Sequence, residues 1–127
     1  VIAAGSVVCK DIKLLGIVSI GAQNVVHPRA SILAENGPIV IGDGNIFEEQ
    51  TVIRNKYVLP KDANGQPQTL VIGNNNMFEV GCVCEAKAVG DNSVLEAKCS
   101  MEMSSKFHEN GNVQKFHLHI IFFKIIW

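Results

Sequence analysis

The sequence predicts a mainly β fold, a parallel β-helix of hexapeptide repeats, and two observations support this prediction. A ten-residue segment occurs three times, beginning at Ile41, Ile72 and Val89, with a looser copy beginning at Ile20. Within and around these copies, an aliphatic or other inward-type residue recurs at every sixth position. A period of six suits neither an α-helix nor a hairpin meander, and it is typical of short strands joined by tight corners, three to each coil.

The six-residue period divides the chain into successive coils. It runs unbroken from Ile2 to Ile32 and restarts at Ile41, Ile72 and Val89. Its positions are Ile2, Val8, Leu14, Ile20, Val26, Ile32, Ile41, Phe47, Ile53, Ile72, Phe78, Cys84, Val89, Leu95 and Met101. Three hexapeptides make a coil of roughly 18 residues, so we expect four to five coils.

The elements follow from this period in chain order. Residues 1–35 supply about two coils, residues 39–53 a third, and residues 72–101 a fourth and part of a fifth. Asn36-Gly37-Pro38 is expected as a corner insertion. Residues 54–71 lack the period and contain two prolines and a glycine, which predicts a loop that leaves the coil at a corner. The predicted β-helix domain therefore spans residues 1–103, with the loop as an insertion.

Residues 104–127 are predicted to be a divergent C-terminal tail. They have no six-residue period, and they contain most of the aromatic residues and three of the four histidines. Large rings fit poorly into a narrow β-helix, so we expect this tail not to continue the coil. Two interpretations remain open: its apolar end covers the edge of the last coil, or it is an alternative end of the sequence.

Composition limits the possible functions. The chain has 127 residues and a net charge of -1, which gives no electrostatic reason to expect binding to nucleic acid or to an acidic membrane. No leader peptide is recognisable, and no apolar run is long enough to insert into a membrane. Because the sequence does not begin with Met, we expect it to be a piece of a longer protein.

The corners and the cysteines carry structural expectations. Gly and Asn are expected to occupy corner positions of positive φ. Asn24, Asn45, Asn76 and Ser93 share one position in successive coils, which predicts a hydrogen-bonded ladder of stacked side chains.

The four cysteines, Cys9, Cys82, Cys84 and Cys99, lack the spacing of a zinc or redox site. Cys82 and Cys99 should lie one strand spacing apart, about 4.8 Å, which permits a disulfide. We favour the alternative that they are small apolar thiols filling a narrow core.

The sharpest surface feature is a column of glutamates. Glu48, Glu79 and Glu96 each follow an inward-facing residue, so we expect them to point outward on one face, about 4.8 Å apart. Stacked like charges are mildly destabilising. The column is either a docking stripe for a basic partner or a solvated stripe screened by water and by Lys98. In the predicted loop, Tyr57 and Lys61 are further candidates for partner contact, with a passive insertion as the alternative.

Enzymatic function is the alternative from another class. Acyltransferases of this fold use a histidine as general base, and carbonic anhydrases of this fold bind zinc through three histidines across a trimer interface. The repeat region contains a single histidine, His27, which precedes a proline. We therefore predict no catalytic residue, no metal site and no cofactor.

Residues 25–53 and 71–83 together point to a family. The runs VVHPRASILAENGP, IVIGDGNIFEEQTVI and VIGNNNMFEVGCV resemble the dynactin subunit 6 family, and the similarity covers about residues 2–99. The resemblance implies a left-handed winding, contrary to the usual right-handed crossover rule. It also implies a non-enzymatic adaptor at the pointed end of dynactin, a cytoplasmic and cytoskeletal complex that engages cargo for dynein-driven transport along microtubules.

The resemblance implies as partners dynactin subunit 5, dynactin subunit 4, the pointed-end actin-related protein and, indirectly, dynein, with no nucleic acid and no membrane insertion. The interface candidates are then Glu48, Glu49, Gln50, Glu79, Glu96, Tyr57 and Lys61. The family continues with further coils and a C-terminal helix, and the tail replaces them here. A truncated form without a stable function is therefore a further alternative.

Overall fold

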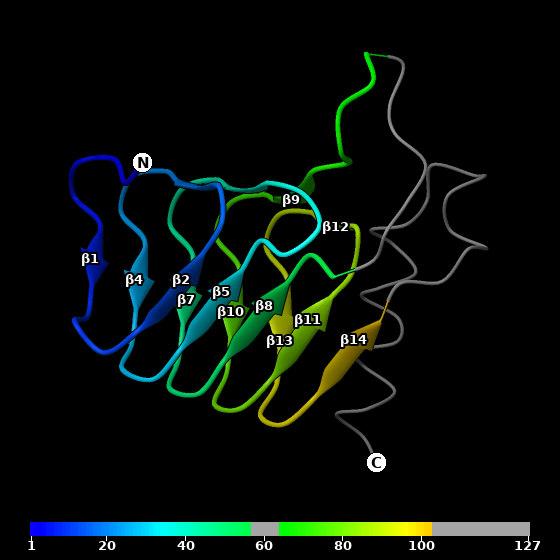
Figure 1. Ribbon diagram of the computed structural model, residues 1–127. Helices are drawn as coiled ribbons and strands as arrows, with labels where there is room; N and C mark the ends of the chain where they lie inside the picture. The colour runs from blue at the N-terminus through cyan, green and yellow to red at the C-terminus, as the bar shows by residue number, and fades with distance from the viewer. Residues whose placement is uncertain (57–63, 103–127) are drawn as a thin grey trace.

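The computed structural model describes residues 1–56 and 64–102, and it shows the chain wound into successive coils (Figure 1). The tail predicted for residues 104–127 lies outside the described residues. Within them, every strand contains two or three residues, and successive strands belong to three different sheets.

Each sheet collects every third strand, and all the pairings between strands are parallel. The β1 sheet contains β1 (Val7–Val8), β4 (Val25–Val26), β7 (Ile46–Phe47), β10 (Met77–Phe78) and β13 (Val94–Leu95). The β2 sheet contains β2 (Lys13–Leu15), β5 (Ser31–Leu33), β8 (Val52–Arg54), β11 (Val83–Glu85) and β14 (Ser100–Glu102). The β3 sheet contains β3 (Val18–Ile20), β6 (Ile39–Ile41), β9 (Leu70–Ile72) and β12 (Ala88–Val89). The predicted parallel β-helix is confirmed, with four full coils and part of a fifth, while its left-handed winding stays a prediction.

The register places the six-residue positions in three inward columns, as predicted. The columns are Val8–Val26–Phe47–Phe78–Leu95, Leu14–Ile32–Ile53–Cys84–Met101 and Ile20–Ile41–Ile72–Val89. From the second coil onward their side chains are buried. Phe47 and Phe78 stack with ring centroids 4.7 Å apart. Leu14, in the first coil, is 44 % exposed because no earlier coil covers it in this structure.

The predicted asparagine ladder is confirmed inside the corner that precedes the β1 sheet. Asn45 is fully buried, and its Nδ2 donates to Gly73 O at 2.9 Å and to Asn24 Oδ1 at 3.0 Å. Its Oδ1 accepts the Asn76 N–H at 2.9 Å. The Nδ2 bonds to glycine carbonyls and the backbone N–H bonds to Oδ1 recur at Asn24 and Asn76, so the ladder satisfies backbone groups that the corner would otherwise leave unpaired.

The corner that follows the β1 sheet is a type II turn in which the third residue has positive φ. The carbonyl of Glu48 accepts the N–H of Thr51 at 3.3 Å, and the corresponding bonds recur in the coils before and after it. The third residues are Arg29, Gln50, Gly81 and Lys98, with φ between 60° and 72°. The expectation that Gly and Asn occupy the positive-φ corners was therefore wrong at this corner, where three of the four residues carry long side chains.

The cysteines of the core are free thiols, so Cys82 and Cys99 form no disulfide. Cys82 and Cys84 are fully buried, as expected for small apolar groups in a narrow core. A hydrogen bond with Cys99, together with burial, raises the pKa of Cys82 above its usual range, and burial raises the pKa of Cys84 to about 12. Over residues 1–56 and 64–102, no helix is long and apolar enough to cross a membrane.

Candidate protein-interaction site

The candidate site is built on the type II turns that follow the β1 sheet. The residue after each inward-facing position begins the turn, and backbone bonds stack these residues in one column: Cys9, His27, Glu48, Glu79 and Glu96. Phe47 is fully buried, whereas the side chain of Glu48, the next residue, is 31 % exposed. The three glutamates therefore form the column that the sequence predicted, which we call the glutamate column.

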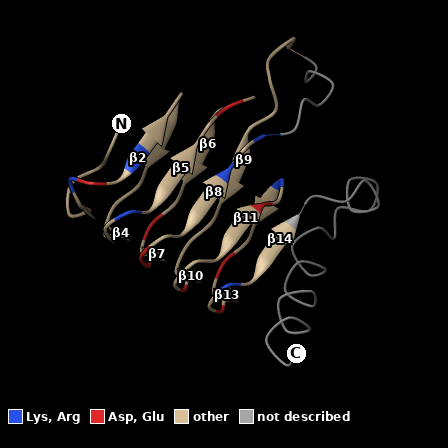
Figure 2. Ribbon diagram, turned by 60° about the horizontal axis from the view of Figure 1, so that its bottom comes forward, with Lys and Arg blue, Asp and Glu red and all other residues tan. Residues whose placement is uncertain are grey.

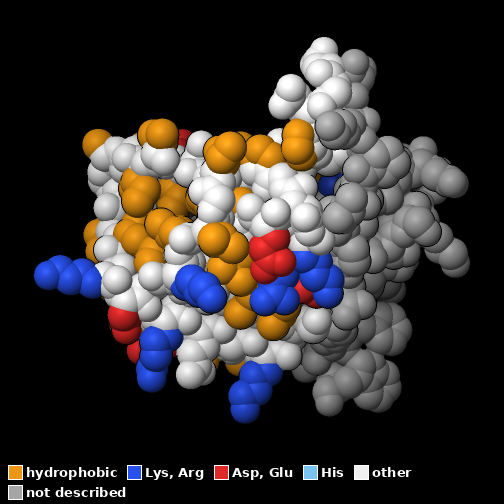
Figure 3. Space-filling view, viewed as in Figure 1, with side chains coloured by type: hydrophobic (Ala, Val, Ile, Leu, Met, Phe, Trp, Pro, Cys, Tyr) orange, Lys and Arg blue, Asp and Glu red, His pale blue; other side chains and the backbone are white. Residues whose placement is uncertain are grey.

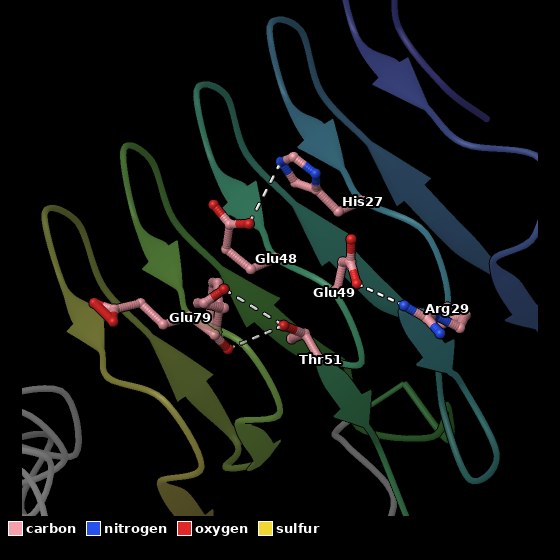
Figure 4. Close-up of polar contacts among 7 residues, drawn as sticks. His27, Arg29, Glu48, Glu49, Thr51 and Glu79 are labelled. Carbon is pink, nitrogen blue, oxygen red and sulfur yellow. Dashed lines mark hydrogen bonds and ion pairs between the residues drawn. The ribbon is translucent and has the colours of Figure 1, made fainter.

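Two of the predicted site residues, Glu48 and Glu49, lie close to basic side chains from the preceding coil (Figure 4). His27 Nε2 lies 3.7 Å from Glu48 Oε2, and Arg29 donates to Glu49 Oε2 at 2.7 Å. Both pairs are partly exposed, so each contributes little to stability, about 0–1 kcal/mol.

The remaining glutamates have no such partner within the described part of the chain. Neither Glu79 nor Glu96 forms an ion pair there, and Lys98, which was expected to screen the column, pairs with neither of them. Acidic residues thus recur from coil to coil along this side of the β-helix (Figure 2). The charge at the C-terminal end of the column is accessible to a basic partner.

The other predicted candidates lie elsewhere. Gln50 is exposed and holds the positive-φ position of its turn, with φ of 61°, so it shapes the backbone beside Glu49. Tyr57 and Lys61 lie outside the described residues, and their predicted contacts stay a prediction.

A charged cluster that the sequence did not predict lies over β8 and β11 (Figure 3). Arg54 Nε lies 3.2 Å from Glu35 Oε1, and Arg54 Nη1 lies 3.3 Å from Glu85 Oε2. Lys56 Nζ is also 3.3 Å from Glu85 Oε2, and the side chain of Glu85 is only 7 % exposed. This cluster lies where the loop leaves β8. We infer that it holds the first residues of the loop, its root, in place.

Backbone and amide hydrogen bonds fix the same root. Asn55 Nδ2 donates to Pro38 O and to Gln68 O, both at 3.0 Å, and Asn36 Nδ2 donates to Lys56 O. These bonds tie the two ends of the loop to the corner insertion of the preceding coil. Spacing alone did not reveal this arrangement, because both insertions interrupt the six-residue period.

The described residues contain no arrangement that supports the enzymatic alternative. Among the described residues, His27 is the sole histidine and no group of three His, Cys, Asp or Glu side chains could hold a metal ion. A hollow of about 510 Å³ beside the loop root is lined by Ile17, Pro38, Pro67 and other residues, among which Glu35 is the one titratable group. This lining contains no nucleophile and base within reach of each other.

The parallel coils and the buried hexapeptide columns together define a hexapeptide-repeat β-helix protein, with a partly exposed column of glutamates on one side. No protein-family model matches the chain. It is 52% identical over 106 residues to dynactin subunit 6 of Danio rerio, which covers 81% of this chain and 54% of the relative. These identities confirm the resemblance to the dynactin subunit 6 family seen in the sequence.

Two further relatives give the same result. Dynactin subunit 6 of Nematostella vectensis is 52% identical over 99 residues, covering 76% of this chain and 54% of the relative. Dynactin subunit 6 of Caenorhabditis elegans is 39% identical over 101 residues, covering 80% of this chain and 52% of the relative. The chain spans about half the length of the curated relatives it matches.

Proposed function

We propose that this chain acts as a non-enzymatic structural subunit of a dynactin complex. The observation that carries the proposal is the identity of 52% over 106 residues with a dynactin subunit 6. Inward positions make up about a third of a hexapeptide repeat. Identity at half of the aligned positions therefore includes outward-facing residues. A shared fold alone does not require outward-facing residues to be identical.

Within the complex, we place the chain at the pointed end, in contact with dynactin subunit 5, dynactin subunit 4 and the pointed-end actin-related protein. In this position it supports cargo engagement for dynein-driven transport along microtubules in the cytoplasm. The glutamate column, with Glu49 and Gln50 beside it, is the proposed contact surface, because Glu79 and Glu96 have no cationic partner in the described part of the chain. Tyr57 and Lys61 of the loop are proposed as further contacts.

The proposal is tested by capturing the tagged chain from cytosol and identifying the bound proteins by mass spectrometry. We expect the wild-type chain to recover dynactin subunits. The triple variant Glu48→Lys, Glu79→Lys and Glu96→Lys should recover at least tenfold less, with an unchanged circular dichroism spectrum.

The matched control introduces three lysines on another face, by Ser19→Lys, Val40→Lys and Val71→Lys. These residues are in register on adjacent strands of the β3 sheet, and the control should recover dynactin as the wild type does. A wild-type chain that recovers no dynactin subunit contradicts the proposed function. Equal recovery by the glutamate variant and the wild type removes only the glutamate column from the interface.

A further inference from the structure

An unbroken apolar column runs along the outer face of the β1 sheet. Each of the five strands contributes one residue, and the register aligns them as Val7–Val25–Ile46–Met77–Val94. Val7 and Val94 are 59 % and 45 % exposed, and the three residues between them are partly exposed. Large contiguous patches of exposed apolar surface are typical of interaction sites.

The glutamate column borders this apolar column. Glu48 lies two residues after Ile46, and Glu79 two residues after Met77, so each pair occupies the same side of its strand. The acidic border ends toward the N-terminus at Glu48, where His27 of the preceding coil lies 3.7 Å from its carboxylate. The outer face of the β1 sheet is therefore amphipathic, with the apolar column beside an acidic edge. Figure 2 shows that acidic residues recur from coil to coil along the axis of the β-helix.

We propose that this face docks an α-helix of a partner protein, which lies along the β-helix axis and carries an apolar stripe flanked on one side by Lys or Arg. The inference rests on the proposed function of the glutamate column as a partner contact and names the kind of partner it fits. The apolar column supplies burial, and the acidic edge supplies charge complementarity that fixes the orientation of the helix.

The spacing of the coils favours a helix over an extended segment. Neighbouring coils are about 4.8 Å apart, and one turn of an α-helix rises about 5.4 Å. The difference of about 0.6 Å per coil amounts to roughly 2–3 Å over the five strands, which flexible Lys and Arg side chains can absorb. An extended strand places same-face residues about 6.6 Å apart, so it loses alignment with the coils after about two of them.

The length of the column sets the length of the partner helix. Four coil intervals span about 19 Å, which corresponds to a helix of roughly 13 residues at 1.5 Å per residue. Apolar residues three or four positions apart then contact successive coils, because such residues share one face of a helix. Basic residues of the partner helix that are adjacent in sequence to these apolar residues, on one flank of the stripe, then face the glutamates.

The test uses the purified full chain and a fluorescein-labelled 18-residue helical peptide with leucines at three- and four-residue spacing and lysines along one flank. Fluorescence anisotropy should show saturable binding. The variant Ile46→Thr with Met77→Thr should bind at least tenfold more weakly. The variant Glu79→Gln with Glu96→Gln should also bind more weakly, and its binding should depend less on salt concentration.

The matched control makes a similar exchange on another face. Val40 and Val71 are outward-facing, in register on β6 and β9, and more exposed than Ile46 and Met77, so Val40→Thr with Val71→Thr should leave binding unchanged. A second control replaces the lysines of the peptide with glutamates, which should abolish binding. No binding of the lysine peptide by the full chain overturns the inference, and so does equal weakening by the two threonine variants.

The peptide assay is independent of dynactin, so the two proposals can fail separately. A chain that captures dynactin from cytosol but does not bind the lysine peptide overturns the helix-docking inference and leaves the subunit role intact. A chain that binds the peptide with the expected mutational pattern but captures no dynactin supports the docking face and contradicts the proposed function.

Discussion

Gly21, Gly42 and Gly73 begin the corners that precede the β1 sheet, and each lies directly beneath a side-chain oxygen of the next coil. A Cβ atom on Gly73 would collide with Asp91 Oδ1 and lie 2.7 Å from Gly90 O. Asp91 Oδ1 accepts the N–H of Asn74 at 2.7 Å, and this bond recurs in the preceding coils. Glycine is required here because it leaves space for the capping side chain, since none of these three glycines has positive φ.

The substitution Gly73→Ala should therefore destabilise the chain more than Gly81→Ala. Gly81 has φ of 72°, but a Cβ there would meet its nearest neighbour, Lys98 Cγ, at an ordinary 3.6 Å. We expect about 1 kcal/mol for Gly81→Ala from backbone strain, and about 3 kcal/mol for Gly73→Ala from overpacking and the lost cap. Urea unfolding followed by circular dichroism measures both, and equal losses would contradict the steric explanation.

Residue-level sequence reasoning identified these corners for a partly wrong reason. The recurring pattern of an aliphatic residue, Gly and Asp or Asn located them. The positive φ expected of Gly and Asn is confirmed at Gly44, Asn75 and Asn92, but it does not apply to the three glycines that begin the corners. Spacing reveals which residues share a column, whereas the space above a glycine depends on the side chain of a different coil. His27 is a related case. It follows Val26 as Glu48 follows Phe47, so the spacing predicts its position in the column. The column was defined by its glutamates, and His27 was therefore not assigned to it.

The buried thiols predict a loss of stability at alkaline pH. The folded-state pKa of Cys84 is raised from 9.0 to about 12, so the folded chain retains a proton that the unfolded chain loses. Its stabilising contribution is full below pH 9 and is lost as the pH rises toward 12. Relative to Cys84→Ala, the wild type should lose about 1.4 kcal/mol more per pH unit in this window. Parallel profiles from urea unfolding at pH 8 to 11 would contradict this expectation.

At the scale of elements, the loop between β8 and β9 is held at its root by amide bonds and ion pairs. Asn55 is buried and bonds to carbonyls on both the corner insertion and the returning end of the loop. Arg54 and Lys56 converge on the buried carboxylate of Glu85. The sequence predicted the loop from the missing period, but it could not predict which residues hold the root, because those contacts join insertions of two different coils.

Asn55→Ala should loosen the loop without unfolding the coils. The substitution removes both bonds donated by Asn55 Nδ2, at about 1 kcal/mol for each lost hydrogen bond, while Pro38 O still accepts the N–H of Leu70 at 2.9 Å. Tryptic cleavage after Lys56 should accelerate at least tenfold, while the circular dichroism spectrum stays unchanged. The control Thr51→Val removes two long bonds of 3.3 and 3.4 Å from a buried hydroxyl and should leave the cleavage rate unchanged. Equal cleavage rates in Asn55→Ala and wild type would refute this role.

At the scale of the whole molecule, each strand of the described coils pairs only with strands of the coils before and after it. Stability is then approximately a sum of coil and interface contributions, as in other repeat proteins. Phe47 lies in the third coil, is fully buried and stacks on Phe78. Leu14 occupies an equivalent inward position in the first coil but is half exposed. The sequence assigns both residues the same role, and only their distance from the end of the array distinguishes them.

This arrangement predicts that equivalent substitutions differ in the stability they cost and in the number of coils whose hydrogen exchange they accelerate. Phe47→Ala should cost about 3–5 kcal/mol because it removes a fully buried ring, and it should speed amide hydrogen exchange in all coils. Leu14→Ala should cost about 1 kcal/mol, with faster exchange confined to β1, β2 and β3, because the end coil opens locally without the rest. Native-state hydrogen exchange read by mass spectrometry separates the two patterns. If Leu14→Ala speeds exchange equally from β1 to β14, the coils unfold as one cooperative unit and the sum of neighbouring interfaces does not describe this molecule.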